Sequence, residues 1–391
     1  MPATEFQPSN FLTRISTRRN QITAMDPNHE LELEDLELFQ RNVSDRFADL
    51  LDHPGDNGLL SISWLRKLVD AFLCCEAKFK VVLIMGREPT QLTKPPLDRL
   101  MPELLDRAVK ALDICNAVSV GVESVRHCQR LAEITVAALE NQNPIGDGQV
   151  KRARKALGAL VASLEEKDHG GSHYKTPERS WSFGRRGATA AVKDRPTATF
   201  RSLSMIVGKN WSAAKQIHAM WANLVAPRGA ELNGLALPVY IMNVVMVFVM
   251  WALVAAVPCQ DRVGLPLHIQ IPRQFAWAHS LNGLQEKIGE EWKKKEKKGS
   301  AGLLEEMQKM EKLSQGLIEF ADGFQFPVEE EGKLEEVAAQ VKEMAEVCRR
   351  MDEGLVPLQQ QIRDVFHQAV RSRSEMMELL EHAGKISQPM M

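Results

Sequence analysis

Few residue groups in this sequence have the types and spacing that chemistry requires. His169 and His173 are spaced so that both could meet one metal ion, but apart from Asp168 no further ligand stands near them. His127 and Cys128 pair a base with a nucleophile, yet adjacent residues on a helix point about 100° apart. Phosphate-loop, nucleophile-elbow and zinc-helix motifs do not occur. We therefore expect no catalytic residue, no cofactor and no metal site.

Two serines lie in a basic stretch where phosphorylation would change the local charge. Ser182 and Ser204 each follow an arginine by three residues, and Arg185 and Arg186 stand in the same stretch. A phosphate there would add negative charge beside these arginines and could switch an interaction. We predict Ser182 and Ser204 as phosphorylation sites, although so short a pattern also arises by chance.

The stretch Trp292–Lys298 is rich in lysine and ends a predicted helix. Near an anionic membrane leaflet each lysine would add about 1 kcal/mol of attraction. The alternative is a solvated helix end whose cations suit the negative end of the helix dipole. Basic runs of this length are common on soluble helices, so the second interpretation is favoured.

One segment is long and apolar enough to cross a membrane. Leu235 to Val257 contains no ionisable side chain except Tyr240, and a spanning helix needs about 20 such residues. Pro238 and Asn243 weaken the insertion signal, and the flanking charges set no orientation. A helix that is apolar all round can equally form the core of a large helical bundle. Both interpretations stay open at this point, with the buried helix slightly favoured.

Helices must position all these groups, because the composition is that of helix formers. Leu, Ala, Glu, Lys and Met recur throughout, whereas aromatic residues make up only 6%. Apolar residues recur at spacings of three and four, which predicts amphipathic helices. In the first of them the predicted apolar stripe is Leu36, Phe39, Val43, Phe47 and Leu50. We expect them after Asp26-Pro27, after Ser61 or Ser63, over 97–140, 149–166 and 205–226, and in three or four stretches from Pro272 to Gly384. The predicted fold class is all-α, a multi-helix bundle with long antiparallel helices.

Near the C-terminus, apolar residues keep a three–four alternation like that of a coiled-coil seam. The alternation runs from Leu334 to Val365, and Gly354 and Pro357 interrupt it. Because proline breaks or kinks a helix interior, we expect a helical hairpin here and not one continuous helix.

The most marked change of character separates two helical regions. Residues 167–202 gather Gly, Ser, Thr, Pro and Arg without an apolar period, which predicts a flexible basic linker. The chain then divides into a flexible N-terminal segment, a helical region, the linker, a second helical region and a tail: 1–25, 26–166, 167–202, 203–384 and 385–391.

Charge and cysteine usage bear on partners and compartment. The formal net charge of -2 gives no global basic excess, so we expect no nucleic-acid partner. Met1 to Arg19 lacks a continuous apolar core, so no secretory signal is predicted. Six cysteines without Cys-x-x-Cys spacing indicate reduced thiols, most of them in the core. We expect a cytoplasmic protein, soluble, membrane-associated or with a single span, and the oligomeric state stays open.

Several stretches go beyond a general helical pattern. They are Phe11 to Gln21 (FLTRISTRRNQ), Glu37 to Gln40 (ELFQ), Leu60 to Leu65 (LSISWL), Asp70 to Phe72 (DAF), Lys94 to Leu100 (KPPLDRL) and Lys110 to Ala117 (KALDICNA). With them the chain resembles the plant ROH family, which is related to the BYPASS-type proteins, over nearly its whole length.

The resemblance implies a plant protein without enzymatic activity that binds the seventy-kilodalton subunits of the exocyst, the complex that tethers secretory vesicles to the plasma membrane. It also implies a role in polarised secretion, including deposition of seed-coat mucilage and cell-wall polysaccharide. The single membrane span often predicted for this family corresponds to Leu235 to Val257. Our leading hypothesis is a non-enzymatic exocyst adaptor, and the alternative is a single-span protein that organises a membrane site without an exocyst role.

Overall fold

Helices make up nearly all of the computed structural model, which describes residues 27–55, 58–84, 89–140, 146–165, 211–259, 265, 271–296, 302–324 and 331–386. Within these ranges the chain forms nine α-helices, two short 3-10 helices and no strand. They are α2 (Pro27–Asp52), α3 (Ile62–Ile84), η1 (Pro89–Thr93), α4 (Leu97–Leu139), α5 (Asp147–Glu165), α6 (Ala213–Trp221), η3 (Gly229–Asn233), α7 (Ala236–Ala256), α8 (Ala278–Glu296), α9 (Glu305–Gly323) and α10 (Glu331–Ile386). The all-α prediction is confirmed.

The first helices form where the local signals place them. The Ser61 hydroxyl accepts a hydrogen bond from the Trp64 N–H at 3.2 Å, which caps the start of α3. The predicted apolar stripe of α2 is buried in full: Leu36, Phe39, Val43, Phe47 and Leu50. The helix expected over 205–226 is shorter than predicted, because within the described residues it begins only at Ala213 and ends at Trp221.

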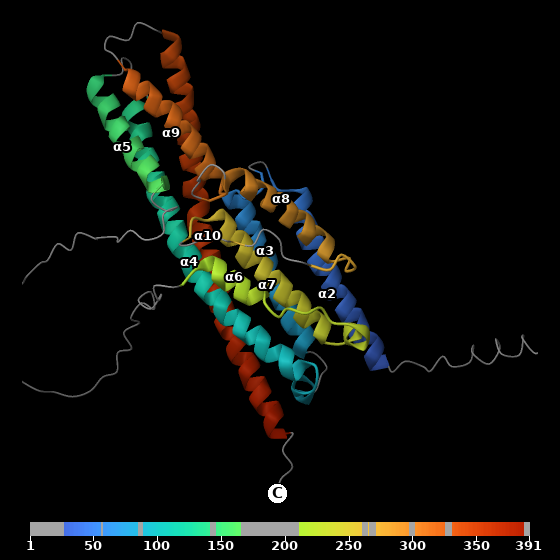
Figure 1. Ribbon diagram of the computed structural model, residues 1–391. Coiled ribbons are helices and arrows are strands. Elements are labelled where there is room, and N and C mark those ends of the chain that lie inside the picture. The colour runs from blue at the N-terminus through green and yellow to red at the C-terminus, as the bar shows by residue number, and fades with distance from the viewer. Residues whose placement is uncertain are drawn as a thin grey trace, which may run out of the picture.

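α7 lies at the centre of the bundle. α3 and α4 pack against it, and α2, α6 and α8 cover the remaining sides. Figure 1 shows α4 and α10 running side by side in opposite directions along the whole molecule. α5 and α9 join these two long helices at one end.

α10 is one continuous helix of 56 residues, so the predicted hairpin is wrong. Pro357 leaves the carbonyl of Glu353 without its helical partner, but Glu353 is exposed and water can bind it. Gly354 marks a close contact and not a break, since a Cβ there would stand 2.6 Å from Cγ2 of Ile62. Packing on α3 and α4 therefore keeps the helix continuous through both residues.

Helices from both sides of residues 166–210 build the same core. α7 packs between α3 and α4, and α10 packs on both of those helices. The predicted linker 167–202 and N-terminal segment 1–25 lie outside the described residues. The predicted domain boundaries therefore stay a prediction.

A glycine on α4 allows the closest approach to the end of α7. A Cβ at Gly121 would stand 2.6 Å from the carbonyl oxygen of Pro258 and 2.6 Å from Cγ1 of Val257. The Pro258 contact is with backbone, which cannot turn aside as a flexible side chain does. Only glycine fits this position without a shift of one helix.

Gly121→Ala is expected to destabilise the fold. Alanine gains about 1 kcal/mol of helix propensity over glycine, but overpacking a tight interior costs typically about 1–3 kcal/mol. Because the added carbon meets backbone, we expect a net loss on the order of 1 kcal/mol in the free energy of unfolding. Urea denaturation followed by circular dichroism measures it.

Gly384→Ala in the last turn of α10 is the matched control, because nothing lies within 4 Å of the Cβ it adds. This variant should match or slightly exceed the wild type in stability. If both variants lost stability equally, the contact at Gly121 would not be the cause.

Candidate functional site at the enclosed apolar helix

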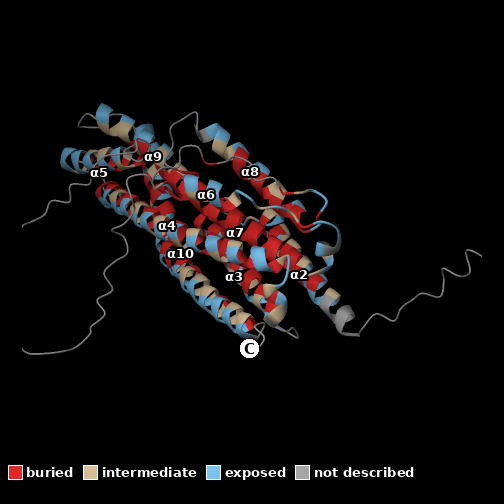
Figure 2. Ribbon diagram, turned by 60° about the horizontal axis from the view of Figure 1, so that its bottom comes forward, coloured by how far each residue is buried: buried red, intermediate tan, exposed pale blue. Residues whose placement is uncertain are grey.

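α7 is the one helix of the described chain that is long and apolar enough to cross a membrane. All 21 of its residues are buried inside the protein. Leu235 and Val257, the ends of the predicted segment, are 6% and 1% exposed. Figure 2 shows α7 as a buried helix among helices whose outer faces are exposed. In this structure the segment is the core of a bundle.

The residues that interrupt the apolar run fit the helix locally. Pro238 is the third helical residue, where an N–H would have no intrahelical partner. Nδ2 of Asn243 donates to the Val239 carbonyl at 2.8 Å, one turn earlier. Tyr240 packs against the rings of Phe275 and Trp277, and burial raises its pKa to about 12. None of these residues needs a partner outside the bundle.

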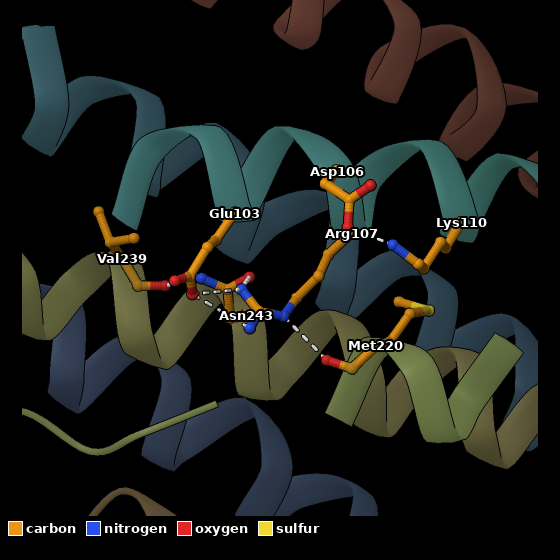
Figure 3. Close-up of polar contacts among 7 residues, drawn as sticks. All are labelled: Glu103, Asp106, Arg107, Lys110, Met220, Val239 and Asn243. Atoms are coloured by element: carbon orange, nitrogen blue, oxygen red, sulfur yellow. Dashed lines mark hydrogen bonds and ion pairs between the residues drawn. The ribbon is translucent and has the colours of Figure 1, made fainter. Parts of the chain in front are cut away.

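A buried arginine from α4 meets Asn243. Arg107 is 4% exposed. Its Nε donates to the carbonyl of Met220 on α6 at 2.8 Å, and its Nη1 lies 3.4 Å from Oδ1 of Asn243. Its Nη2 lies 3.3 Å from Oε2 of Glu103, one turn earlier on α4. Figure 3 shows these contacts converging between α4, α6 and α7.

These contacts tie three helices together at a charged group. Removing an ion from water costs several kcal/mol unless its charge and donors are matched. Glu103 supplies the opposite charge, while Asn243 and the Met220 carbonyl accept from the remaining donors. Arg107 therefore restrains α7 from the side, and moving α7 out of the bundle would leave a buried cation short of an acceptor.

A second set of contacts closes the C-terminal end of α7. The N–H groups of Leu303 and Leu304 donate to the carbonyls of Ala255 and Ala256 at 3.2 and 3.1 Å. The last carbonyls of a helix have no intrahelical partner. The chain that leads into α9 therefore supplies the hydrogen bonds that water would supply at an exposed helix end.

Glu306, at the start of α9, connects the same part of the chain to the start of α3. Its two carboxylate oxygens accept from the Ile62 N–H at 3.1 and 3.2 Å, and the residue is 1% exposed. Burial raises the pKa of Glu306 to about 7, while the Ile62 N–H and Arg350 oppose the rise and Glu305 adds to it. A helix N-terminus favours an anion, but here desolvation is the larger effect.

Comparison with known proteins places this bundle in a family. The family model described as Protein ROH1-like matches residues 1–380. The chain belongs to the ROH1-like family. It is 58% identical to Protein ROH1A of Arabidopsis thaliana over 99% of each chain. It is 42% identical to Protein ROH1D of the same plant, over 98% of this chain and 100% of that relative. No solved structure matches it.

The resemblance to the plant ROH family is thereby confirmed over the whole chain. The predicted phosphorylation sites Ser182 and Ser204 lie outside the described residues, as do His169 and His173, for which no metal site is predicted. Phosphorylation at the two serines stays a prediction.

The cysteines of this ROH1-like protein are free thiols, five of them buried and Cys74 half-buried. Burial raises the pKa of Cys75, Cys115 and Cys348 to about 12, so these thiols stay protonated near neutral pH. Cys128 is buried whereas the adjacent His127 is exposed, as their helical positions predict. Among the described residues, no group of three or more His, Cys, Asp or Glu is arranged to hold a metal ion.

The lysine-rich end of α8 is described as far as Glu296. Lys293 and Lys294 are exposed, and Lys294 pairs with Glu291 at 2.7 Å. This part of the tract is a solvated helix end.

Arg107 and Glu306 were not identified from the sequence as buried charged residues, although their spacing in the sequence indicates burial. Arg107 follows Leu104 by three residues and precedes Ile114 by seven, so it stands on the buried stripe of α4. Glu306 likewise stands four residues before the buried Met310. A charged residue at an apolar position of the helical period is predicted to be buried, but the pattern does not indicate which residue forms its hydrogen bond or ion pair.

Glu306→Gln is expected to remove part of the pH dependence of stability. The folded-state pKa of about 7 lies above the ordinary value of 4.5, so folding favours the protonated carboxyl. The raised pKa contributes to the free energy of unfolding. This contribution is fully present below about pH 4.5 and is lost as the pH rises through 7. Glutamine is uncharged and still accepts from Ile62. Between about pH 5 and pH 8 the free energy of unfolding of the variant should therefore rise relative to that of the wild type, by on the order of 3 kcal/mol at most.

Urea denaturation at several pH values measures this difference. Glu319→Gln, on the exposed part of the same helix, removes the same charge without the burial and is the control. A gap between wild type and Glu306→Gln that did not change with pH would contradict a carboxyl titrating near neutrality.

Proposed function

We propose that this ROH1-like protein is a non-enzymatic adaptor in polarised secretion. In this proposal it binds a seventy-kilodalton exocyst subunit through the outer faces of its helices, and it works in the cytoplasm at the membrane surface. Deposition of seed-coat mucilage or cell-wall polysaccharide is the process in which we expect it to act.

Two kinds of observation support the proposal. Membership of the ROH1-like family, with 58% identity to Protein ROH1A, supports a plant protein of this kind. The complete burial of α7 is the structural observation on which the proposal rests, because it gives the apolar segment a role inside a soluble bundle. α4 and α10, of 43 and 56 residues, then offer long polar outer faces to a partner.

The length and composition of α7 favour a second candidate, a single-span membrane protein. Insertion would require α7 to leave its place among α2, α3, α4, α6 and α8. The Arg107 guanidinium would lose Asn243, and the N–H groups of Leu303 and Leu304 would lose their acceptors. Each buried polar group left unpaired costs about 1–3 kcal/mol. The bundle therefore opposes insertion, and we place the peripheral adaptor first.

Carbonate extraction of membranes separates these two candidates. Wild-type protein should leave the membrane pellet. The double variant Val245→Glu with Val249→Glu should aggregate, because both valines are 0% exposed and an unpaired buried charge costs several kcal/mol.

Val120→Glu with Val356→Glu makes the same chemical change at two sites that are each 61% exposed. This control should stay soluble and folded and should extract like the wild type. The opposite pattern, a wild type that stays in the pellet and a core variant that is soluble and folded, would show that α7 spans the bilayer.

Binding to the exocyst is tested with the purified protein. Full-length wild type, immobilised on resin, should retain a purified seventy-kilodalton exocyst subunit from plants, and the soluble double variant at Val120 and Val356 shows whether that face of α4 and α10 takes part. The aggregation-prone core variant should retain none. A folded wild type that retained no exocyst subunit would count directly against the proposal.

A further inference from the structure

α5 carries four cationic side chains within five residues: Lys151, Arg152, Arg154 and Lys155. Lys151 pairs with Asp147 at 2.6 Å, and Arg154 pairs with Asp322 of α9 at 2.5 Å. Arg152 and Lys155 are exposed and have no acidic partner within the described part of the chain. α5 therefore carries two cations, Arg152 and Lys155, with which no described acidic residue pairs.

A hollow of about 410 Å³ lies beside these cations, between α5 and α9. The charged side of the hollow is formed by three cations, Lys151, Arg154 and Lys155, and by Asp147, which pairs with Lys151. The apolar side is formed by Val150, Ala321 and Phe324. The hollow combines positive charge with a surface on which an apolar group can rest.

Two contacts shape the hollow. The Phe324 ring is held edge-on by Phe320, with ring centroids 5.6 Å apart. Gly158 keeps the α5 side open, since a Cβ there would approach Nη1 of Arg154 at 3.3 Å. A larger residue at 158 would occupy the space in front of Arg154.

We propose that this hollow binds an acidic peptide segment of a partner protein. An apolar side chain of the segment rests on the Phe324 side, and its carboxylates pair with Lys151 and Lys155, which line the hollow. This inference rests on the proposed adaptor function for its biological setting, and it adds the surface and the chemistry of the partner.

The charges nearby favour a peptide over a membrane. α9 lies between α5 and α10 at this end of the molecule, as Figure 1 shows. The first part of α10 exposes four glutamates: Glu335, Glu336, Glu343 and Glu346. An anionic bilayer pressed against this end would face these carboxylates too, and like charges repel. A single peptide strand can contact the hollow alone.

Affinity in such a site has to come from several contacts together. Exposed ion pairs are individually weak and are screened by salt. The apolar contact with Phe324 adds a contribution to the binding free energy that salt does not weaken. We therefore expect modest affinity that falls with ionic strength, and a preference for acidic segments that carry an aromatic residue.

The test is fluorescence anisotropy with the full-length protein at low salt. The probe is a short fluorescein-labelled peptide in which glutamates surround one phenylalanine, compared with the same peptide carrying alanine in that place. Lys151→Glu with Lys155→Glu should weaken binding of the phenylalanine peptide by about tenfold or more. Lys293→Glu with Lys294→Glu on α8 changes the net charge equally and should alter the affinity less than about twofold.

Gly158→Leu tests the hollow itself without changing the charge. The variant should abolish the advantage of the phenylalanine peptide over the alanine peptide while both still bind weakly. Circular dichroism confirms that each variant is folded. The proposal is overturned if the two double variants bind equally, or if Gly158→Leu keeps the full preference for phenylalanine.

Vesicles containing phosphatidylserine form the last comparison. If they bind through Lys151 and Lys155 while the peptide does not, the surface faces lipid and the peptide proposal is wrong. Failure here is distinguishable from failure of the exocyst experiment, since each uses its own ligand. An exocyst subunit retained equally by wild type and Lys151→Glu with Lys155→Glu would leave the adaptor function standing and place its contact elsewhere.

Discussion

A helix that is apolar on every side is stable in water only where protein encloses it, and its polar backbone ends must find partners there. In α7 both requirements are met by other helices of the chain. Carbonyls at its C-terminal end accept from Leu303 and Leu304, and its buried amide, Asn243, meets Arg107 of α4. Unpaired polar groups in such a place would each cost about 1–3 kcal/mol. The positions of α3, α4 and α9 follow from these needs.

The enclosure joins parts of the chain that are far apart in sequence. Ile62 and Glu306 are separated by 244 residues, and Arg107 and Asn243 by 136. α10 packs on α3 and α4 and thereby covers them from the C-terminal end of the chain. Contacts of such long sequence separation close long loops, and the entropy lost in closing them opposes folding. The N-terminal helices therefore complete their packing only with the C-terminal ones.

This dependence explains which features the sequence predicts. The α2 stripe from Leu36 to Leu50 and the Ser61 cap depend on neighbours within a few residues, and both are found as expected. The hairpin predicted from Pro357 and Gly354 was wrong, because packing against α3, which is distant in sequence, decides whether the helix continues through these two residues. Hydropathy could not decide between a membrane span and a core helix for Leu235 to Val257, since the two have the same composition. Arg107 and Glu306 show their burial by spacing, but their partners come from tertiary packing alone.

The same constraint separates the parts of the molecule that stabilise it from those free to bind. α5 and the C-terminal part of α9 pack on each other and on the long helices α4 and α10, beyond the end of the enclosed helix. Residues there are not required to shield α7, so charged side chains such as Lys155 and open positions such as Gly158 are tolerated. Substitutions around α7 change stability and every function together, because they disturb the core. Substitutions on the outer face of α5 leave that core intact, so they change the surface of the protein with little effect on its fold.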